Sequence, residues 1–210
     1  MCFILLFFGL FLSISANSSN NIKSYSKENI SNYFSALLSS RNNDIGESRK
    51  FFIKIKELSK IHFPYVKEYI LVLVQEQKIE EAASFLRKID NEFNNFSEAN
   101  IILGTTYLAN KKYGLAIKKF NLINKDPRSS NFDKLIANYL INYSKIFDKK
   151  IIVDKEFFQG IPENYEDFTI IHEAFINCYL DKNIEESFLK LLNSSEVDYT
   201  RYVYFYANYL

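Results

Sequence analysis

The 210-residue chain contains few of the residues that interrupt helices and few of those that build reactive sites. It has five Gly, three Pro, two Cys, two His and no Trp. Because Gly and Pro most often interrupt helices, their scarcity favours helical segments joined by short turns. Two His and two Cys are too few to form a metal-ligand cluster, which needs several such groups to converge. The composition therefore predicts an all-α protein without a metal site.

Sequence patterns typical of catalysis are missing as well. The five glycines are isolated from one another, so there is no glycine-rich phosphate loop, and no Gly-x-Ser-x-Gly motif occurs. His172 and Glu173 begin a zinc-protease pattern, but Ile176 stands where the second His is required. A formal net charge of +1 provides no concentrated basic face for nucleic acid. We therefore expect no enzyme activity, no cofactor, no metal and no nucleic-acid partner.

An apolar run from Phe3 to Leu12 sets the beginning of the chain apart from the rest. The small residues that follow it predict a signal peptide over 1–16, and a polar linker over 17–28 comes next. Because the usual charged segment before the apolar run is missing, a short membrane anchor and a start codon placed too late remain alternatives. We expect a periplasmic or envelope-associated protein whose only membrane contact is this N-terminal segment.

The two cysteines of the chain predict no internal disulfide after export. Removal of the signal peptide would take Cys2 with it and leave Cys178 as the one remaining cysteine, so no internal disulfide could form. Cys178 lies on an apolar helix face, which favours a buried small side chain over a reactive thiol.

Small residues recur at a fixed step in the middle of the chain. Ser48, Ala82 and Ala116 are 34 residues apart. The same step connects Ile45, Ile79 and Tyr113, and also Phe52, Leu86 and Phe120. A period of this length is typical of helical hairpins that stack side by side, because one hairpin is too small to bury its own apolar face.

The third unit, residues 97–130, carries the clearest motif. Its distinctive positions are Leu103, Gly104, Tyr107, Ala116, Phe120 and Pro127. Leu-Gly, then Tyr, then Ala with a large aromatic residue and a final Pro resembles a tetratricopeptide repeat. The resemblance implies tandem antiparallel helical hairpins stacked as an α-solenoid, and a non-catalytic scaffold for protein–protein interaction.

The repeat predicts the organisation of the remainder of the chain. We expect units at 29–62, 63–96 and 97–130, an irregular stretch at 131–167, a further hairpin at 168–197 and an incomplete unit at 198–210. The irregular stretch is predicted because the step from Ala116 to Ser187 exceeds two repeats by about three residues. Gly160 and Pro162 place the insertion around 151–165.

The resemblance also implies where a partner binds, since the first helix of each hairpin lines a concave groove in this family. The corresponding residues are Tyr33, Leu37, Lys67, Leu71, Val74, Ile101, Thr105 and Leu108. This mostly apolar set predicts an apolar helix or extended peptide as partner, and the family's Lys and Asn clamp for C-terminal carboxylates is missing. The alternative is that the chain is the repeat portion of a larger envelope enzyme, for example a glycosyltransferase, whose catalytic domain lies beyond residue 210.

Aromatic residues concentrate at the end of the sequence. From residue 198 the chain is predicted to form another first helix, with Tyr202, Tyr206 and Tyr209 near helical spacing. An uncovered aromatic face is typical of an interface. We therefore expect possible self-association through this end.

Overall fold

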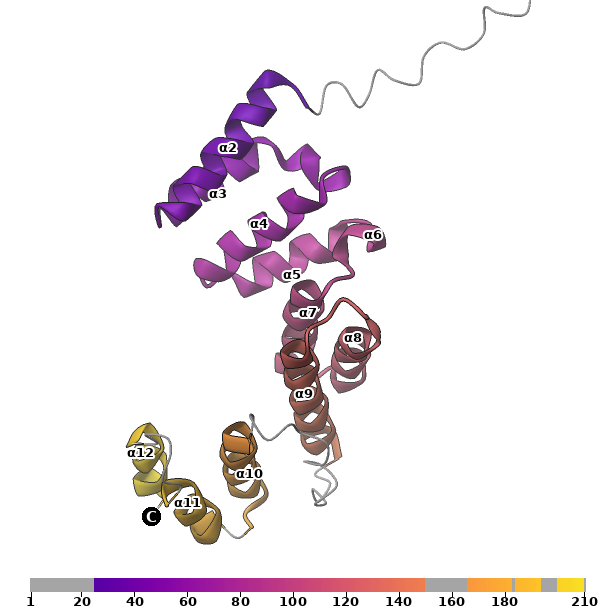
Figure 1. The fold of residues 1–210 in the computed structure, drawn as a ribbon. Helices are drawn as coiled ribbons and strands as arrows, with labels where there is room; N and C mark the ends of the chain where they lie inside the picture. The colour runs from indigo at the N-terminus through magenta and orange to yellow at the C-terminus, as the bar shows by residue number, and fades with distance from the viewer. Residues whose placement is uncertain (1–24, 150–165, 183, 194–199, 210) are drawn as a thin grey trace, which may run out of the picture. The chain divides into compact units, whose positions relative to one another are not determined.

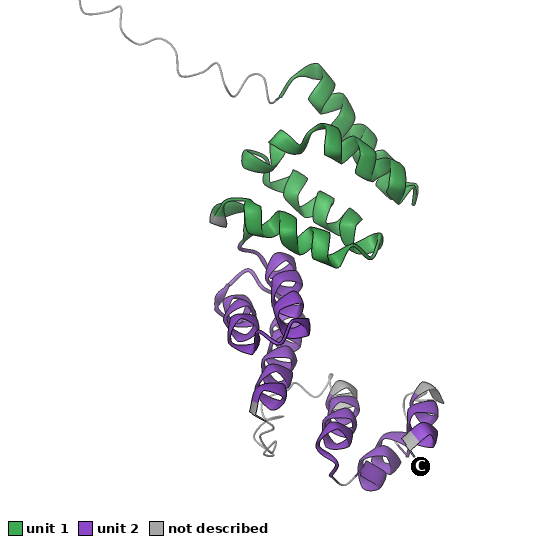
Figure 2. Ribbon diagram, turned by 180° about the vertical axis from the view of Figure 1, so that it is seen from behind, with its two compact units in different colours: residues 1–94 green, residues 95–210 purple. Residues whose placement is uncertain are grey.

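The computed structural model describes four stretches of the chain: residues 25–149, 166–182, 184–193 and 200–209. Every regular element within these stretches is a helix, and none is a strand (Figure 1). The all-α prediction is therefore confirmed for the described residues. The chain divides into two compact units, residues 1–94 and 95–210 (Figure 2), and each is considered on its own.

Unit 1 contains two helical hairpins together with two short helices. Its elements are α2 (Lys27–Arg41), α3 (Ile45–Lys54), the 3-10 helix η1 (Lys56–Lys60), α4 (Phe63–Gln75), α5 (Ile79–Lys88) and α6 (Asn91–Asn94). Helix α2 packs against α3, α3 against α4, and α4 against α5. Each of these helices therefore lies beside the next one along the chain.

Unit 2 shows the same kind of succession among its described residues. Its elements are α7 (Ser97–Ala109), α8 (Tyr113–Lys125), α9 (Asn131–Lys149), α10 (Glu166–Leu180), α11 (Ile184–Leu192) and α12 (Thr200–Tyr209). Helix α8 packs against both α7 and α9, and α11 packs against both α10 and α12. The apolar centre of the first group is Ala116, Phe120, Ile123, Ala137 and Ile141, and that of the second is Ala174, Ile184, Phe188 and Leu191.

The first helix of each described hairpin ends with the same backbone turn. Asn43, Gln77, Lys111 and Asp181 have φ angles between 56° and 61°, a left-handed conformation that usually selects Gly. The following residue in each case donates its backbone N–H to the carbonyl five residues earlier: Asp44 to Ser39, Lys78 to Leu73, Lys112 to Tyr107, and Lys182 to Asn177, at 2.8–2.9 Å. This bond satisfies a carbonyl at the helix end.

The 34-residue step in the sequence corresponds to equivalent buried positions. Ser48, Ala82 and Ala116 are fully buried, and so are Phe52, Leu86 and Phe120. Small side chains at the first set let the two helices of a hairpin approach closely. In the first hairpin this contact is polar, because the Ser48 hydroxyl donates a 2.8 Å hydrogen bond to the Ala36 carbonyl.

Helix starts follow ordinary capping chemistry. The Ser26 hydroxyl accepts a hydrogen bond from the backbone N–H of Asn29. Helix α2 therefore begins at Lys27, two residues before the predicted start of the first repeat at residue 29. The Asp44 carboxylate accepts from the N–H of Glu47 at the start of α3. Helix α4 has Pro64 in its first turn, where the missing N–H costs nothing.

The second helix of the first hairpin ends before the apolar residues Ile55 and Leu58. Helix α3 ends at Lys54, and the chain continues as η1. Ile55 between them is fully buried and Leu58 nearly so. Both apolar side chains therefore face the core at the point where α3 gives way to η1.

Part of the predicted organisation falls beyond the described residues. This is true of the signal peptide at 1–16, most of the linker and the insertion around 151–165. Within the stretch expected to be irregular, residues 131–149 form the regular helix α9.

Candidate functional site

Helix α2 exposes an apolar stripe. Ile30, Phe34 and Leu38 are spaced four residues apart and are 45%, 58% and 59% exposed. Residues four apart lie on the same face of a helix, so these side chains form a row about 12 Å long. Val72 corresponds to Leu38 in the next hairpin and is fully buried. Helix α2 packs against α3 and, less extensively, against α4, and the three side chains of the row remain exposed in the described part of the chain.

A small, half-open apolar cavity lies beside this stripe and shares Ile30 and Phe34 with it. Its volume is about 290 Å³, and it is lined by Tyr25, Asn29, Ile30, Tyr33, Phe34, Leu58 and His62. The beginning of α2 supplies one side of the cavity, and the other side comes from η1 and the residue preceding α4. The cavity is therefore formed by residues that precede α3 in the sequence and by residues that follow it.

Aromatic rings form most of the cavity wall, and they meet edge to face. The centroid of the His62 ring is 5.1 Å from that of Tyr33 and 6.0 Å from that of Tyr25, with interplanar angles of 86° in both cases. Tyr33 also meets the ring of Phe52 in the core at 6.2 Å. These contacts fix the orientation of Tyr33, since edge-to-face packing stabilises one relative placement of two rings.

Polar groups at the cavity are few and mostly engaged. Asn29 Nδ2 donates a 2.9 Å hydrogen bond to Glu57 Oε1, and the Tyr25 hydroxyl lies 3.4 Å from the Ile61 carbonyl. Burial raises the pKa of the Tyr33 hydroxyl, and the nearby Glu68 carboxylate raises it further. Burial lowers the pKa of His62. Both shifts favour the uncharged forms of Tyr33 and His62.

The predicted groove residues of unit 1 differ in what they contact. Tyr33 lines the cavity, and Leu71 is 47% exposed on α4. Leu37, Lys67 and Val74 are half-buried.

The predicted groove residues of unit 2 take part in helix packing. Ile101 and Leu108 are partly buried against the cluster of α8 and α9. The Thr105 hydroxyl donates to the Ile101 carbonyl at 2.8 Å. Substitution of Ile101 or Leu108 would therefore disturb the fold as well as any surface.

The predicted interface at the C-terminal end is partly occupied by the protein itself. Tyr202 and Tyr206 pack against the cluster of α10 and α11, and the ring of Tyr206 stacks on that of Phe188 at 5.3 Å. The neighbouring Tyr204 and Phe205 are the exposed aromatic residues, at 71% and 51%. The side chain of Tyr209 lies outside the described part of the chain.

A cluster of polar side chains, which the sequence did not predict, joins α9 to α10. The Tyr143 hydroxyl lies 2.6 Å from His172 Nδ1, and the ring of Tyr139 stacks on His172 at 4.1 Å. The Tyr139 hydroxyl is 3.0 Å from the Thr169 hydroxyl. Burial lowers the pKa of His172 and raises that of Tyr143 to about 12. These uncharged groups hold two helices together.

Other kinds of site find no support among the described residues. No group of three or more His, Cys, Asp and Glu side chains is placed to hold a metal ion there. Cys178 is a half-buried thiol against the cluster of α10 and α11. None of the described helices combines the length and the apolar character needed to cross a bilayer.

Comparison of the chain with protein-family models, with curated proteins and with solved structures finds no match in any of the three. The candidate surface is therefore defined by its own geometry, which is an apolar stripe on α2 beside an aromatic cavity.

Proposed function

We propose that this protein is a non-catalytic scaffold of the tetratricopeptide type that binds an apolar helix or extended peptide. The observation that carries the proposal is the recurrence of one helix-ending turn at Asn43, Gln77 and Lys111, 34 residues apart. Fully buried small residues follow each of these turns at the same distance. A repeated unit of this kind presents the same helix face several times, which suits the binding of elongated partners.

The open face of α2 supports the binding part of the proposal. Ile30, Phe34 and Leu38 form one contiguous exposed apolar row. Single exposed apolar residues are normal on a protein surface, whereas contiguous ones are typical of an interaction site. Helix-in-groove recognition uses apolar side chains at this spacing. The apolar run at Phe3–Leu12 supports the further proposal that the scaffold works after export, in the periplasm or cell envelope.

Affinity capture with matched variants tests this function. The bait is the full chain without residues 1–16, applied to an envelope extract of the source cells. Phe34→Asp and Leu71→Asp place a charge at exposed apolar positions of unit 1, while Leu115→Asp does the same at a 44% exposed position of α8. We expect the first two variants to lose a partner that the wild type and Leu115→Asp retain.

Circular dichroism controls for folding in this experiment. If all four proteins are equally helical and capture the same partner equally well, the apolar face of unit 1 is not the binding surface. A partner lost by Leu115→Asp alone would move the surface to α8.

A further inference from the structure

The cavity beside α2 has the size of an aromatic side chain. An apolar cavity of about 150 Å³ holds one benzene ring, and this cavity measures about 290 Å³. A two-ring indole fits that volume, whereas a methyl or isopropyl group leaves most of it empty. The cavity therefore selects for a large flat apolar group.

The wall chemistry favours the same kind of group. The rings of Tyr25, Tyr33 and His62 are already held edge to face, and Leu58 beside them is only 3% exposed. An entering ring finds further edges and faces in the offset or T-shaped geometry that aromatic pairs prefer. Because these wall rings are fixed before binding, little side-chain entropy is lost when the cavity fills.

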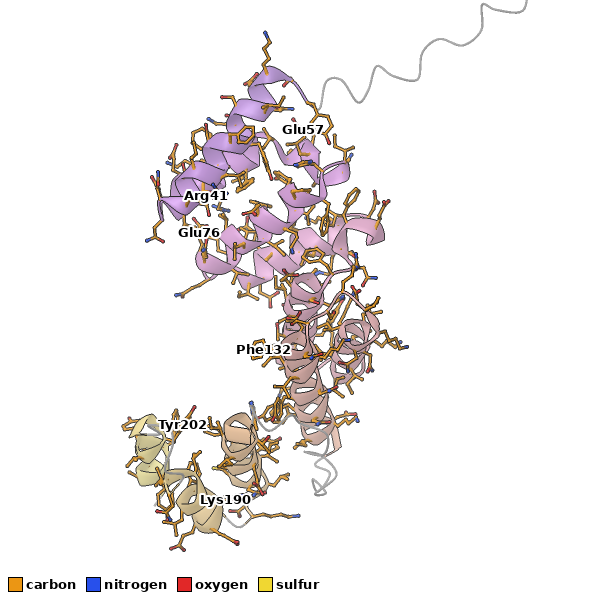
Figure 3. All side chains as sticks on the ribbon, viewed as in Figure 1. Arg41, Glu57, Glu76, Phe132, Lys190 and Tyr202 are labelled. Atoms are coloured by element: carbon orange, nitrogen blue, oxygen red, sulfur yellow. The ribbon has the colours of Figure 1, made fainter. Side chains whose placement is uncertain are left out.

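One carboxylate is hydrogen-bonded to the cavity wall, and a second acts on the wall electrostatically. Glu57 accepts the hydrogen bond from Asn29, which lines the cavity. Glu68 lies close enough to act on the hydroxyl of Tyr33. Glu57 is exposed at the surface (Figure 3), so its charge remains available to a partner. A cationic side chain next to the bound ring would complement these two groups, whereas an acidic one would be repelled.

The apolar stripe extends from the cavity along α2. Ile30 and Phe34 belong to both features, and Leu38 lies one turn beyond Phe34. A segment with its ring in the cavity would therefore place further apolar side chains on α2 toward Arg41. The cavity supplies the anchor, and the stripe sets the direction of the segment.

We propose that the cavity between α2, η1 and His62 binds the tryptophan side chain of a partner segment that carries Lys or Arg beside the tryptophan. The inference rests on the scaffold function proposed above and names the chemistry of its partner. Tryptophan is the aromatic side chain that fills a cavity of this volume most completely. The flanking cation pairs with Glu57 and Glu68, and apolar residues continue along the stripe.

The chain itself contains no Trp, so the fluorescence of a tryptophan peptide reports binding without background. The probe is a capped helical peptide of about twelve residues, about 18 Å long, with one Trp flanked by Lys and two Leu farther along. Matched peptides replace Trp by Ala, or the flanking Lys by Glu, and are measured by competition. N-acetyltryptophanamide tests the free indole group alone.

We expect a saturable blue shift of the Trp emission, and a loss of affinity of about tenfold or more for the Ala peptide, as for an anchor residue. The Glu peptide should bind more weakly, and Glu57→Lys should reverse the preference. Phe34→Asp should weaken binding, whereas Leu115→Asp should not. Saturation by N-acetyltryptophanamide with no gain from the peptide would overturn the partner-segment assignment in favour of a small aromatic ligand.

Failure of the tryptophan-anchor proposal can be distinguished from failure of the scaffold function. If the peptides do not bind, or bind Phe34→Asp as well as the wild type, the tryptophan-anchor proposal is wrong. Partner capture sensitive to Leu71→Asp would then still support the scaffold. If both experiments are insensitive to the variants, the proposed function fails too.

Discussion

The ring of Phe120 on α8 lies directly against the backbone of Gly104 on α7. A Cβ atom placed on Gly104 would be 2.3 Å from Cε1 of Phe120 and 2.7 Å from Cζ. Phe120 is fully buried, so a shift of its ring would disturb a packed core. This contact gives the Gly of the Leu103-Gly104 pair a physical role.

Gly104→Ala should therefore destabilise the protein. Overpacking costs about 1–3 kcal/mol, and the better helix propensity of Ala returns about 1 kcal/mol at most. Urea unfolding followed by circular dichroism measures the difference. Gly114→Ala is the matched control, because a Cβ there meets nothing within 4 Å, and it should be neutral or slightly stabilising. Equal stability of both variants would mean that Phe120 can shift.

A second prediction concerns the left-handed turns. Lys111 has a φ of 57°, a conformation that costs a residue with a Cβ about 1–2 kcal/mol. Lys111→Gly should stabilise the protein by about 1 kcal/mol, after part of the gain is lost to the greater freedom of Gly in the unfolded chain. Lys118→Gly, at an exposed position inside α8, should instead destabilise it by about 1 kcal/mol, because Gly is unfavourable in a helix interior. Thermal melts of the two variants provide the comparison.

A third prediction concerns the ion pair between the two hairpins of unit 1. The Arg49 guanidinium on α3 donates to both carboxylate oxygens of Glu81 on α5, at 2.8 and 2.9 Å. Both side chains are partly exposed, so Arg49→Ala should cost only about 0.5–1 kcal/mol. Arg49→Lys should recover only part of this, because Arg49 Nε also lies 3.4 Å from Glu76 Oε2 and a single ammonium nitrogen cannot occupy both positions. Urea unfolding should show that the difference in unfolding free energy between the wild type and Arg49→Ala is smaller in high salt than in low salt.

The sequence predicted the hairpins because their signals are local. Ser48, Ala82 and Ala116 are small where two helices meet, and that requirement is visible as a small residue at a fixed step. The unusual turn residues Asn43, Gln77 and Lys111 could not be recognised in this way. They share no side-chain chemistry, and only the backbone shows that they are equivalent.

The cavity could not be predicted for a different reason. It joins Tyr33 to Leu58 and His62 across the break between α3 and η1, and the sequence does not locate that break. Helical spacing is compatible with one row of Ile30, Phe34 and Leu38, although the sequence analysis did not predict it. Spacing identifies a face of a helix, but not whether a neighbouring helix covers it.

The same limit applies to the groove and to the C-terminal end. Ile101 lies on the predicted face of α7 and yet packs against α8 and α9. On α12, Tyr206 stacks on Phe188, while the adjacent Phe205 is exposed. Neighbouring positions on a helix point about 100° apart, so the covering element decides which ring is available.

The last prediction concerns the pH dependence of stability, which the junction between α9 and α10 should influence. His172 stacks on Tyr139 and lies 2.6 Å from the Tyr143 hydroxyl. Burial lowers its pKa from the ordinary value of 6.5, so the unfolded chain takes up this proton at a higher pH than the folded chain. As the pH falls below about 6.5, the unfolded state binds more protons and stability decreases. Above that pH both states are neutral and the effect disappears.

Urea unfolding between about pH 5 and pH 8, within the range where His titrates, should therefore show a free energy of unfolding that falls toward the acidic end. His172→Gln should flatten this slope, although the lost stacking lowers stability at every pH. His62→Gln is the matched comparison, because burial also lowers the pKa of His62. This variant should remove only the part of the pH dependence that His62 contributes. Tyr143→Phe should keep the stacked rings while removing the hydroxyl beside Nδ1. An acid slope that is identical in the wild type and His172→Gln would show that His172 titrates as it does in the unfolded chain, and the junction would then have no part in the pH response.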